Sequence, residues 1–438
     1  MTPLRLLPLS LALGVAFAAP VHAQSLVELY EAARAHDATW QSAKSQYDAN
    51  LFRAEQARAG ILPSANLSAG ASRTNSEVRT PPSDRDFTSQ NATLSAAQPL
   101  YRPANVATYE QGKKQAELAQ AQLNAASQDL IIRVSQAYFD VLAAQDTLTF
   151  VRAQKTAVSE QLASAKRNFE VGTSTITDSR EAQARFDLVV AQEIAAENDL
   201  RVKRLALDNL VGKAGAQPRP LAAPVALPTL SPDDVNLWVQ QAEDASPTVQ
   251  QFRTALDIAR LETEKAKAGH KPTLDLTASY GIARGPNNIT GVQTRTNNTT
   301  VGVSFNLPLF AGFATQNRIR ETLSLEEKAQ SDLEAARRSV AQATRSAFFG
   351  VVSGLGQVKA LEASEQSSQL ALDANKLGYQ VGVRINIDVL NSQSQLFQTK
   401  RDLAQARYNV LLGSLKLRQA NGTLKAEDLQ GINGVLTK

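Results

Sequence analysis

Two short stretches of the chain hold the residues best able to do chemistry. Tyr379 to Asp388 reads Y-Q-V-G-V-R-I-N-I-D, and Phe169 to Asp178 reads F-E-V-G-T-S-T-I-T-D. Each stretch places a Val-Gly pair shortly before an aspartate, so one pattern occurs twice. A carboxylate in such a place attracts cations or accepts hydrogen bonds. Catalysis would need further partners.

Those partners are missing from the sequence. There are no cysteines, which excludes thiolate catalysis, Cys-ligated zinc and disulfides. The three histidines, His22, His36 and His270, are scattered, and we find no phosphate-binding glycine loop, G-x-S-x-G elbow or H-E-x-x-H motif. The net charge of +4 is spread along the chain without an aromatic-interleaved basic run. We therefore expect a protein that is not an enzyme, has no cofactor or metal, and binds no nucleic acid.

The two aspartates follow predicted helix-to-helix turns. Gly172 and Gly382 stand where one helical pattern ends and another begins, and glycine adopts the left-handed conformation that ends a helix without a Cβ clash. A carboxylate just after such a turn stabilises the positive end of the next helix. This structural interpretation covers Asp178 and Asp388 equally, so the pattern alone leaves a functional role open.

The first 23 residues predict a secretory signal peptide. Arg5 precedes an apolar run from Leu6 to Phe17, and Val21-His22-Ala23 forms an A-x-A-like cleavage site before Gln24. No later segment approaches the roughly 18 consecutive apolar residues of a membrane-spanning helix. We expect an exported protein without a helical anchor.

The mature chain is predicted to contain two structural repeats, at 24–216 and 233–422. A proline-rich connector at 217–232 separates them, and residues 423–438 form a C-terminal tail. Boundary residues recur 209 or 210 positions apart. The pairs are Gly60 and Gly269, Pro63 and Pro272, Pro99 and Pro308, Gly172 and Gly382, Asp178 and Asp388, and Gly212 and Gly422.

Long helices dominate each repeat. The first repeat is predicted to have helices at Leu26–Gly60, from Pro103 to Phe169, and from Asp178 to Leu210. The second of these would be about 100 Å long at about 1.5 Å per residue. Apolar positions at steps of three and four predict antiparallel coiled-coil packing. The predicted inward positions are Tyr138, Val141, Gln145, Leu148, Val151, Lys155, Val158, Leu162, Ala165 and Phe169, and then Phe348, Val351, Leu355, Val358, Leu361, Glu365, Ser368, Leu372, Asn375 and Tyr379.

Two hairpins complete the repeats. Strands are predicted from Asn66 and up to Pro99 around a polar run at 74–89, and on both sides of a polar loop at 284–298. Each strand has one apolar and one polar face, which fits either a membrane β-barrel or a soluble sandwich. Four strands cannot close a barrel, and an open edge in lipid leaves backbone groups unsatisfied. Three copies would give twelve strands, so we predict a homotrimer with a shared barrel.

This order of elements, built around V-G-x-x-x-I-x-D turns, resembles the TolC family of outer-membrane efflux proteins. The most specific stretches are Y-Q-V-G-V-R-I-N-I-D-V-L-N, from Tyr379 to Asn391, and A-Q-A-R-Y-N-V-L, from Ala404 to Leu411. The resemblance implies a mostly α fold in which three protomers share a twelve-stranded outer-membrane β-barrel, continued by an α-barrel into the periplasm. The connector at 217–232 and the tail at 423–438 would form an equatorial belt round the α-barrel. It implies the passive exit duct of a tripartite efflux pump or a type I secretion system. The alternative is a coiled-coil structural protein of the periplasm or cell surface.

The resemblance also assigns a gate at the periplasmic tip. Asp388 would form a ring of three carboxylates that closes the tunnel. Asn391 stands where the best-known members have a second acidic residue, so the second ring would be neutral.

A latch would hold this gate shut. By resemblance, the Tyr379 hydroxyl bonds Asp178 on the neighbouring helix pair. Arg384 would reach Asp178 and Thr177 of the next protomer.

The exposed turns would bind a partner. By resemblance, Val171, Gly172, Val381 and Gly382 meet the hairpin tips of a periplasmic adaptor protein. The adaptor would connect the duct to an inner-membrane RND or ABC transporter, while the barrel lies in outer-membrane lipid.

Overall fold

The computed structural model describes residues 23–79, 82–286 and 292–437. Apart from Ala23, the predicted signal peptide lies outside the described residues. Within the described ranges, no helix combines the length and apolar character needed to cross a membrane. The helices and strands are α1 (Leu26–His36), α2 (Ala38–Arg58), β1 (Ser64–Arg79), β2 (Pro82–Tyr101), α3 (Pro103–Glu170), α4 (Ile176–Val211), α5 (Val235–Ala245), α6 (Pro247–Lys267), β3 (Thr273–Pro286), β4 (Gln293–Asn306), α7 (Ala314–Gln380), α8 (Asn386–Ala420) and α9 (Asp428–Asn433).

The chain folds into two compact units, and α2, α3 and α7 each continue from one into the other. One unit contains the chain up to Gln41, Ala126–Ser246 and the residues from Val340 onward. The other contains Ser42–Ala125 and Pro247–Ser339, and therefore holds the whole sheet.

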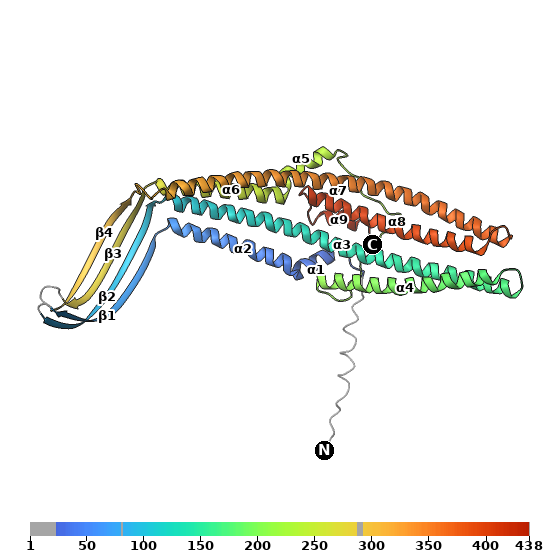
Figure 1. Ribbon diagram of the computed structural model, residues 1–438, viewed down its shortest axis with the longest axis horizontal. Coiled ribbons are helices and arrows are strands. Elements are labelled where there is room, and N and C mark those ends of the chain that lie inside the picture. Colours follow the sequence, from blue (N-terminus) through green and yellow to red (C-terminus); the bar gives the residue numbers. More distant parts are fainter. Residues whose placement is uncertain (1–22, 80–81, 287–291, 438) are drawn as a thin grey trace, which may run out of the picture. The chain divides into compact units, whose positions relative to one another are not determined.

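The sheet is antiparallel, with its four strands in the order β1-β2-β3-β4 (Figure 1). The strands are longer than predicted. β1 and β2 stay in register from Ser64 opposite Ala97 to Arg79 opposite Pro82, so the polar run at 74–89, predicted as a loop, is mostly strand. The loop predicted at 284–298 shortens in the same way, because β3 and β4 pair as far as Pro286 and Gln293. Backbone hydrogen bonds hold such a ladder whatever the polarity of its side chains.

The predicted two-faced character of the hairpins is confirmed by the register. Leu67 lies opposite Leu94, and Leu94 lies opposite Tyr280. Leu276 lies opposite Val303. Residues that face one another across a ladder share one face of the sheet, so a single apolar face crosses all four strands.

In the first unit, α3 pairs with α4 and α7 pairs with α8 in antiparallel fashion; these two helix pairs are called the coil below. The turns that join the helices of each pair lie at the same end (Figure 1). Gly172 and Gly382 both have φ 79°, which confirms the predicted left-handed turns. Gly212 caps α4 with φ 69°, as its predicted position requires.

The predicted packing period is confirmed through most of α3 and parts of α7. The buried positions include Val141, Leu148, Val151, Val158, Leu162 and Ala165 in α3, and Phe348, Val351, Val358 and Leu372 in α7. Two predicted inward positions are wrong, because Gln145 is exposed and Phe169 keeps 43% of its surface exposed. Phe169 lies in the last turn of α3, where the helix pair ends and covers it only in part.

The prediction of a single helix at Leu26–Gly60 is also wrong, since the helix is interrupted at Asp37. Asp37 has an extended backbone, and its carboxylate accepts a 2.7 Å hydrogen bond from the Trp40 backbone N–H, which starts α2. Arg133 of α3 binds the same carboxylate through two nitrogens, at 2.8 and 3.0 Å. This bidentate pair holds the pKa of Asp37 below its usual value.

The proline-rich connector and the C-terminal tail lie side by side. Leu221 and Leu436 form an antiparallel bridge, and the Ala222 N–H donates to the Val435 carbonyl at 2.9 Å. The connector also covers the helices, because Leu227 and Leu230 pack against buried residues of α7 and α8. The two segments predicted to form the belt therefore contact one another and the coil.

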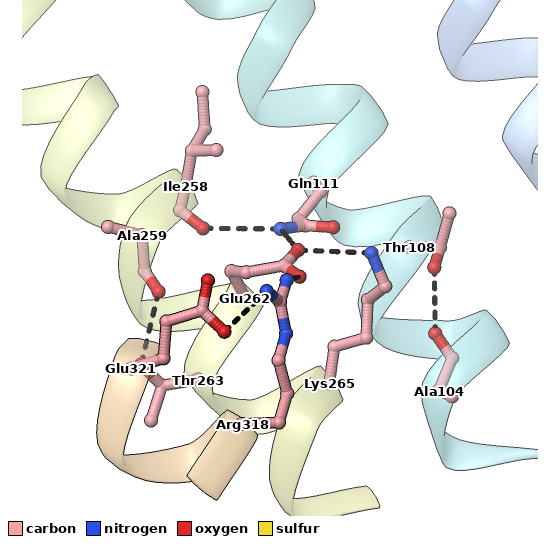
Figure 2. Close-up of polar contacts among 10 residues, drawn as sticks. All are labelled: Ala104, Thr108, Gln111, Ile258, Ala259, Glu262, Thr263, Lys265, Arg318 and Glu321. Atoms are coloured by element: carbon pink, nitrogen blue, oxygen red, sulfur yellow. Dashed lines mark hydrogen bonds and ion pairs between the residues drawn. The ribbon is translucent and has the colours of Figure 1, made fainter. Parts of the chain in front are cut away.

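In the sheet-bearing unit, Glu262 joins three helices (Figure 2). Its carboxylate accepts hydrogen bonds from Gln111 of α3 at 2.9 Å, Lys265 of α6 at 3.0 Å and Arg318 of α7 at 2.7 Å. Burial raises its pKa, but the three hydrogen bonds outweigh that effect and lower the pKa to about 2.

We predict that Glu262→Gln lowers the thermal stability of the protein at neutral pH by about 1.5–3 kcal/mol, the usual contribution of hydrogen bonds to a charged group. A carboxylate with a depressed folded-state pKa stabilises the fold above its unfolded pKa of 4.5 and loses that effect as the pH falls toward about 2. The difference in Tm between wild type and variant should therefore shrink across that window. Glu264→Gln, which removes an exposed pair with Lys267, is the control and should change Tm little.

Candidate functional site

The two turns at the end of the coil have the same backbone. In the first, the N–H groups of Thr173 and Ser174 donate to the Asn168 carbonyl. In the second, those of Val383 and Arg384 donate to the Gly378 carbonyl. These hydrogen bonds close each turn and leave the residues at its tip accessible.

The side chains at these tips are exposed and apolar. Val171 is 72% exposed and Val381 is 65% exposed. A Cβ at Gly172 or Gly382 would meet no atom within 4 Å, so only the left-handed φ requires glycine there. The four predicted docking residues therefore lie together in pairs on an accessible surface, with no packing role that would explain the valines.

The helices that follow the two turns begin differently. Thr175 caps α4 in a capping box: its hydroxyl accepts from the Asp178 N–H, and the Asp178 carboxylate accepts from the Thr175 N–H at 3.0 Å. The cap of α8 is Ile385, which has no side chain for this bond. Asp388 instead lies 3.6 Å from Arg384. The Asp178 carboxylate therefore helps to cap its helix, whereas the Asp388 carboxylate takes no part in capping α8.

The predicted latch residues have other partners within the protomer. Tyr379 is half-buried, and its hydroxyl accepts a 3.1 Å hydrogen bond from Asn168, whereas the Asp178 carboxylate is engaged in its capping box. Arg384 folds back over Gly378, where an added Cβ would come within 2.6 Å of the arginine Cγ. Thr177 is exposed. Contacts of Arg384 with a next protomer remain a prediction.

Sequence reasoning missed Asn386, the first residue of α8. It is 0% exposed. Its Nδ2 donates to the Asp178 carbonyl at 3.1 Å, and its Oδ1 accepts from Gln161 of α3 at 2.5 Å. The equivalent residue of the first repeat, Ile176, is 48% exposed. That polar-for-apolar difference between the repeats is the signal that could have pointed to Asn386.

This arrangement of paired coils, sheet and turns has counterparts among known proteins. The sequence profile of the family described as "Outer membrane efflux protein" matches residues 29–213 and 238–423. The chain belongs to this family.

Relatives match along nearly the whole chain. The "Outer membrane protein TolC" of Vibrio cholerae is 34% identical, covering 99% of this chain and 98% of the relative. The "Alkaline protease secretion protein AprF" of Pseudomonas aeruginosa is 32% identical, covering 93% and 86%. Among solved structures, the outer membrane protein VceC of Vibrio cholerae covers 91% of this chain and 96% of its own with a TM-score of 0.77, and its 19% identity supports the fold alone.

Membership of the outer membrane efflux protein family confirms several predictions from the sequence. The fold is mostly helical, with long antiparallel helix pairs and a four-stranded antiparallel sheet, as in the TolC-like structures. The protein is an outer-membrane efflux or secretion channel with a periplasmic extension, and a transport protein instead of an enzyme. The alternative of a coiled-coil structural protein is thereby set aside.

Further polar contacts tie α8 of this channel protein to α3 and α4. Asn391, the residue predicted for the second ring, accepts a 2.8 Å hydrogen bond from Arg185 of α4 through its amide oxygen. Farther along, Tyr408 donates to Asp146 of α3 at 2.7 Å. Burial raises the pKa of Asp146, and the bond from Tyr408 opposes part of that rise. Leu390 adds a fully buried apolar contact with the α3–α4 pair.

We predict that Asn386→Ala destabilises this end of the coil by about 1–3 kcal/mol, because it leaves Gln161 and the Asp178 carbonyl without their buried partner. The variant should lower Tm and increase proteolysis near the turns. Asn409→Ala is the matched control, since Asn409 is exposed on the same helix. Among the described residues, its side chain forms a hydrogen bond only with Gln405. Equal behaviour of the two variants would show that Asn386 contributes nothing to holding α8.

Proposed function

We propose that three copies of this chain form a passive exit duct, with a shared barrel in the outer membrane and a helical tunnel in the periplasm. The sheet carries this proposal. β1 and β4 lie at its two edges, so each protomer has one edge strand to offer to either neighbour. Pairing β4 of one copy with β1 of the next closes twelve strands, which satisfies the edge backbone groups and turns the continuous apolar face toward lipid.

The helical part supports the same assembly. Five large apolar side chains of α4 are exposed in the single protomer: Ile176, Leu188, Ile194, Val202 and Leu205. Apolar surface of this kind on a long helix is suited to packing against another protomer. A neighbouring copy in a trimer would cover it.

The gate of the duct would be at the turns. Three copies of Asp388 around one axis would concentrate cations, since carboxylates that converge on one point add their negative fields. Asn391 contributes no charge, and its bond to Arg185 draws the amide toward α4. We therefore propose one acidic ring at Asp388 and a neutral position at Asn391, with weaker block by polyvalent cations than two acidic rings would give.

The latch would consist of contacts that are easy to break. Arg384 would reach Asp178 and Thr177 of the next protomer, and Tyr379 would hold the second helix pair against the first. An exposed ion pair contributes at most about 1 kcal/mol. Three copies of such a pair would bias the closed state and still allow opening.

The turns also would be the docking site for a periplasmic adaptor. The paired valines, Val171 and Val381, together with Gly172 and Gly382, offer apolar contacts around an open backbone. The adaptor would link the duct to an inner-membrane RND or ABC transporter, which would supply the energy. Relatives named for protease secretion, such as AprF, support a type I secretion role as well as efflux.

Single-channel conductance of the purified protein in a planar lipid bilayer tests the duct and its constriction. We expect a cation-selective pore of low conductance, whose cation selectivity falls in Asp388→Asn because the ring loses its charge. Divalent cations on the periplasmic side should reduce the wild-type current more than the variant current. If properly trimeric protein makes no pore, the duct is excluded.

The latch is tested in the same bilayer. Arg384→Ser and Tyr379→Phe should each raise the conductance, because each removes a contact that holds the turns together. High salt should mimic Arg384→Ser, since screening weakens an exposed ion pair. Lys376→Ser, an exposed cation near the end of α7, is the control. Wild-type conductance in both latch variants would contradict the latch and leave the duct intact.

A further inference from the structure

Two arginines of the sheet face each other, and no carboxylate of the described residues pairs with either. Arg284 of β3 and Arg295 of β4 are directly opposite in the register. Cβ atoms of such pairs are about 5 Å apart, where like charges destabilise a sheet. Both side chains are exposed, and neither has an ion pair or a side-chain hydrogen bond to a residue within the described ranges.

A third arginine of the sheet shows the contrast. Arg73 of β1 binds the Asp86 carboxylate of β2, with its Nε at 3.0 Å from Oδ1. The carboxylate compensates the charge of Arg73 inside the protomer. The chain supplies no such carboxylate for the Arg284–Arg295 pair among its described residues.

The pair lies on the apolar face of the sheet. Side chains alternate along a strand, so Arg284 shares its face with Leu276 and Tyr280, and Arg295 shares its face with Val303. Their position is thus on the surface that the proposed trimeric barrel turns toward lipid. A lumenal role for these guanidinium groups does not fit this register.

The height of the pair along the sheet matches a membrane boundary. Arg284 lies ten residues beyond Leu274, which is about 33 Å along the strand at about 3.3 Å per residue. With a tilt of about 40°, this corresponds to about 25 Å across the membrane, the usual height of the apolar band of a barrel. At that boundary an arginine costs only about 0–1 kcal/mol, and lipid headgroups lie within its reach.

A hollow adjoins the two guanidinium groups. It has a volume of about 500 Å³, and its lining combines apolar residues with two amides and the two arginines: Ala69, Gly70, Ala71, Gln90, Asn91, Ala92, Ile282, Arg284 and Arg295. Gln90 lies directly opposite Arg284, at the arginine end of the hollow. The three alanine side chains of the hollow are short, so they leave room for an acyl chain to lie along the sheet. The arginines at its edge suit a phosphate, which guanidinium groups bind with paired hydrogen bonds.

We infer that Arg284 and Arg295 together bind the phosphate of an anionic lipid in the outer leaflet, with one of its acyl chains in the alanine-lined hollow. This inference rests on the proposed trimeric barrel, which turns the apolar face toward lipid. The site explains why two like charges are kept opposite each other beside an apolar surface. It also fixes the depth of the barrel in the membrane.

Native mass spectrometry of the purified trimer with lipid A, a phosphorylated lipid, tests the site. We expect one tightly bound lipid A per protomer, and at least a tenfold loss of affinity in Arg284→Gln/Arg295→Gln. Arg73→Gln is the matched control, on the same face but paired with Asp86, and should bind lipid A as wild type does. Phosphatidylcholine, whose phosphate is balanced by a choline, should bind far more weakly to all three proteins.

Several outcomes would overturn the inference. Equal lipid A binding by the double variant and wild type would exclude the arginine pair, and displacement of lipid A by millimolar inorganic phosphate would indicate a site for free phosphate. Conductance of the same preparations separates this inference from the duct. A conducting wild-type trimer with arginine-independent lipid binding removes only the lipid site, whereas wild-type protein that forms neither trimer nor pore removes both.

Discussion

The reversal of each long helix at a left-handed glycine is the constraint on which the coil depends. α3 and α7 each extend through both units of the chain, and both end two residues before a glycine with φ 79°. A side chain with a Cβ is strained in this conformation, so these positions set where the chain can turn back. The turns fix the register of α4 against α3 and of α8 against α7. The buried contacts between the helices of each pair follow from that register.

The two repeats keep this backbone and differ in what their side chains do with it. In the first repeat, Thr175 and Asp178 satisfy the start of α4 locally, and Ile176 is exposed. In the second, Ile385 offers no cap, Asn386 is buried against α3 and α4, and Asp388 faces Arg384. The first repeat therefore stabilises the start of its own helix, whereas the second uses the first residue of its helix, Asn386, for contacts with the other helix pair. The contacts of Asn386 are neutral and buried, so salt should weaken them far less than it weakens the exposed pair of Arg384.

Local sequence patterns predicted much of the fold but few of the contacts at the candidate site. The periods of three and four gave the long helices, and Gly172 and Gly382 gave the turns, because both signals act over a few residues. The break at Asp37 could not be predicted, since Arg133, which holds its carboxylate, is remote in the sequence. The burial of Asn386 likewise depends on Gln161, on another helix pair.

A protomer of this kind leaves too much apolar surface uncovered to be a stable end point on its own. Val301 and Phe305 on the sheet, Phe310 beyond β4 and Ile194 on α4 are all largely exposed, and they lie on several different elements. In the proposed trimer, lipid would cover the side chains of the sheet face, and a neighbouring protomer would cover those of the helices. If the trimer forms as proposed, the folding of each copy is coupled to membrane insertion and assembly, and its stability depends on the concentration of the other copies. A substitution at an exposed apolar position of α4 should consequently act on assembly before it acts on the packing within one protomer.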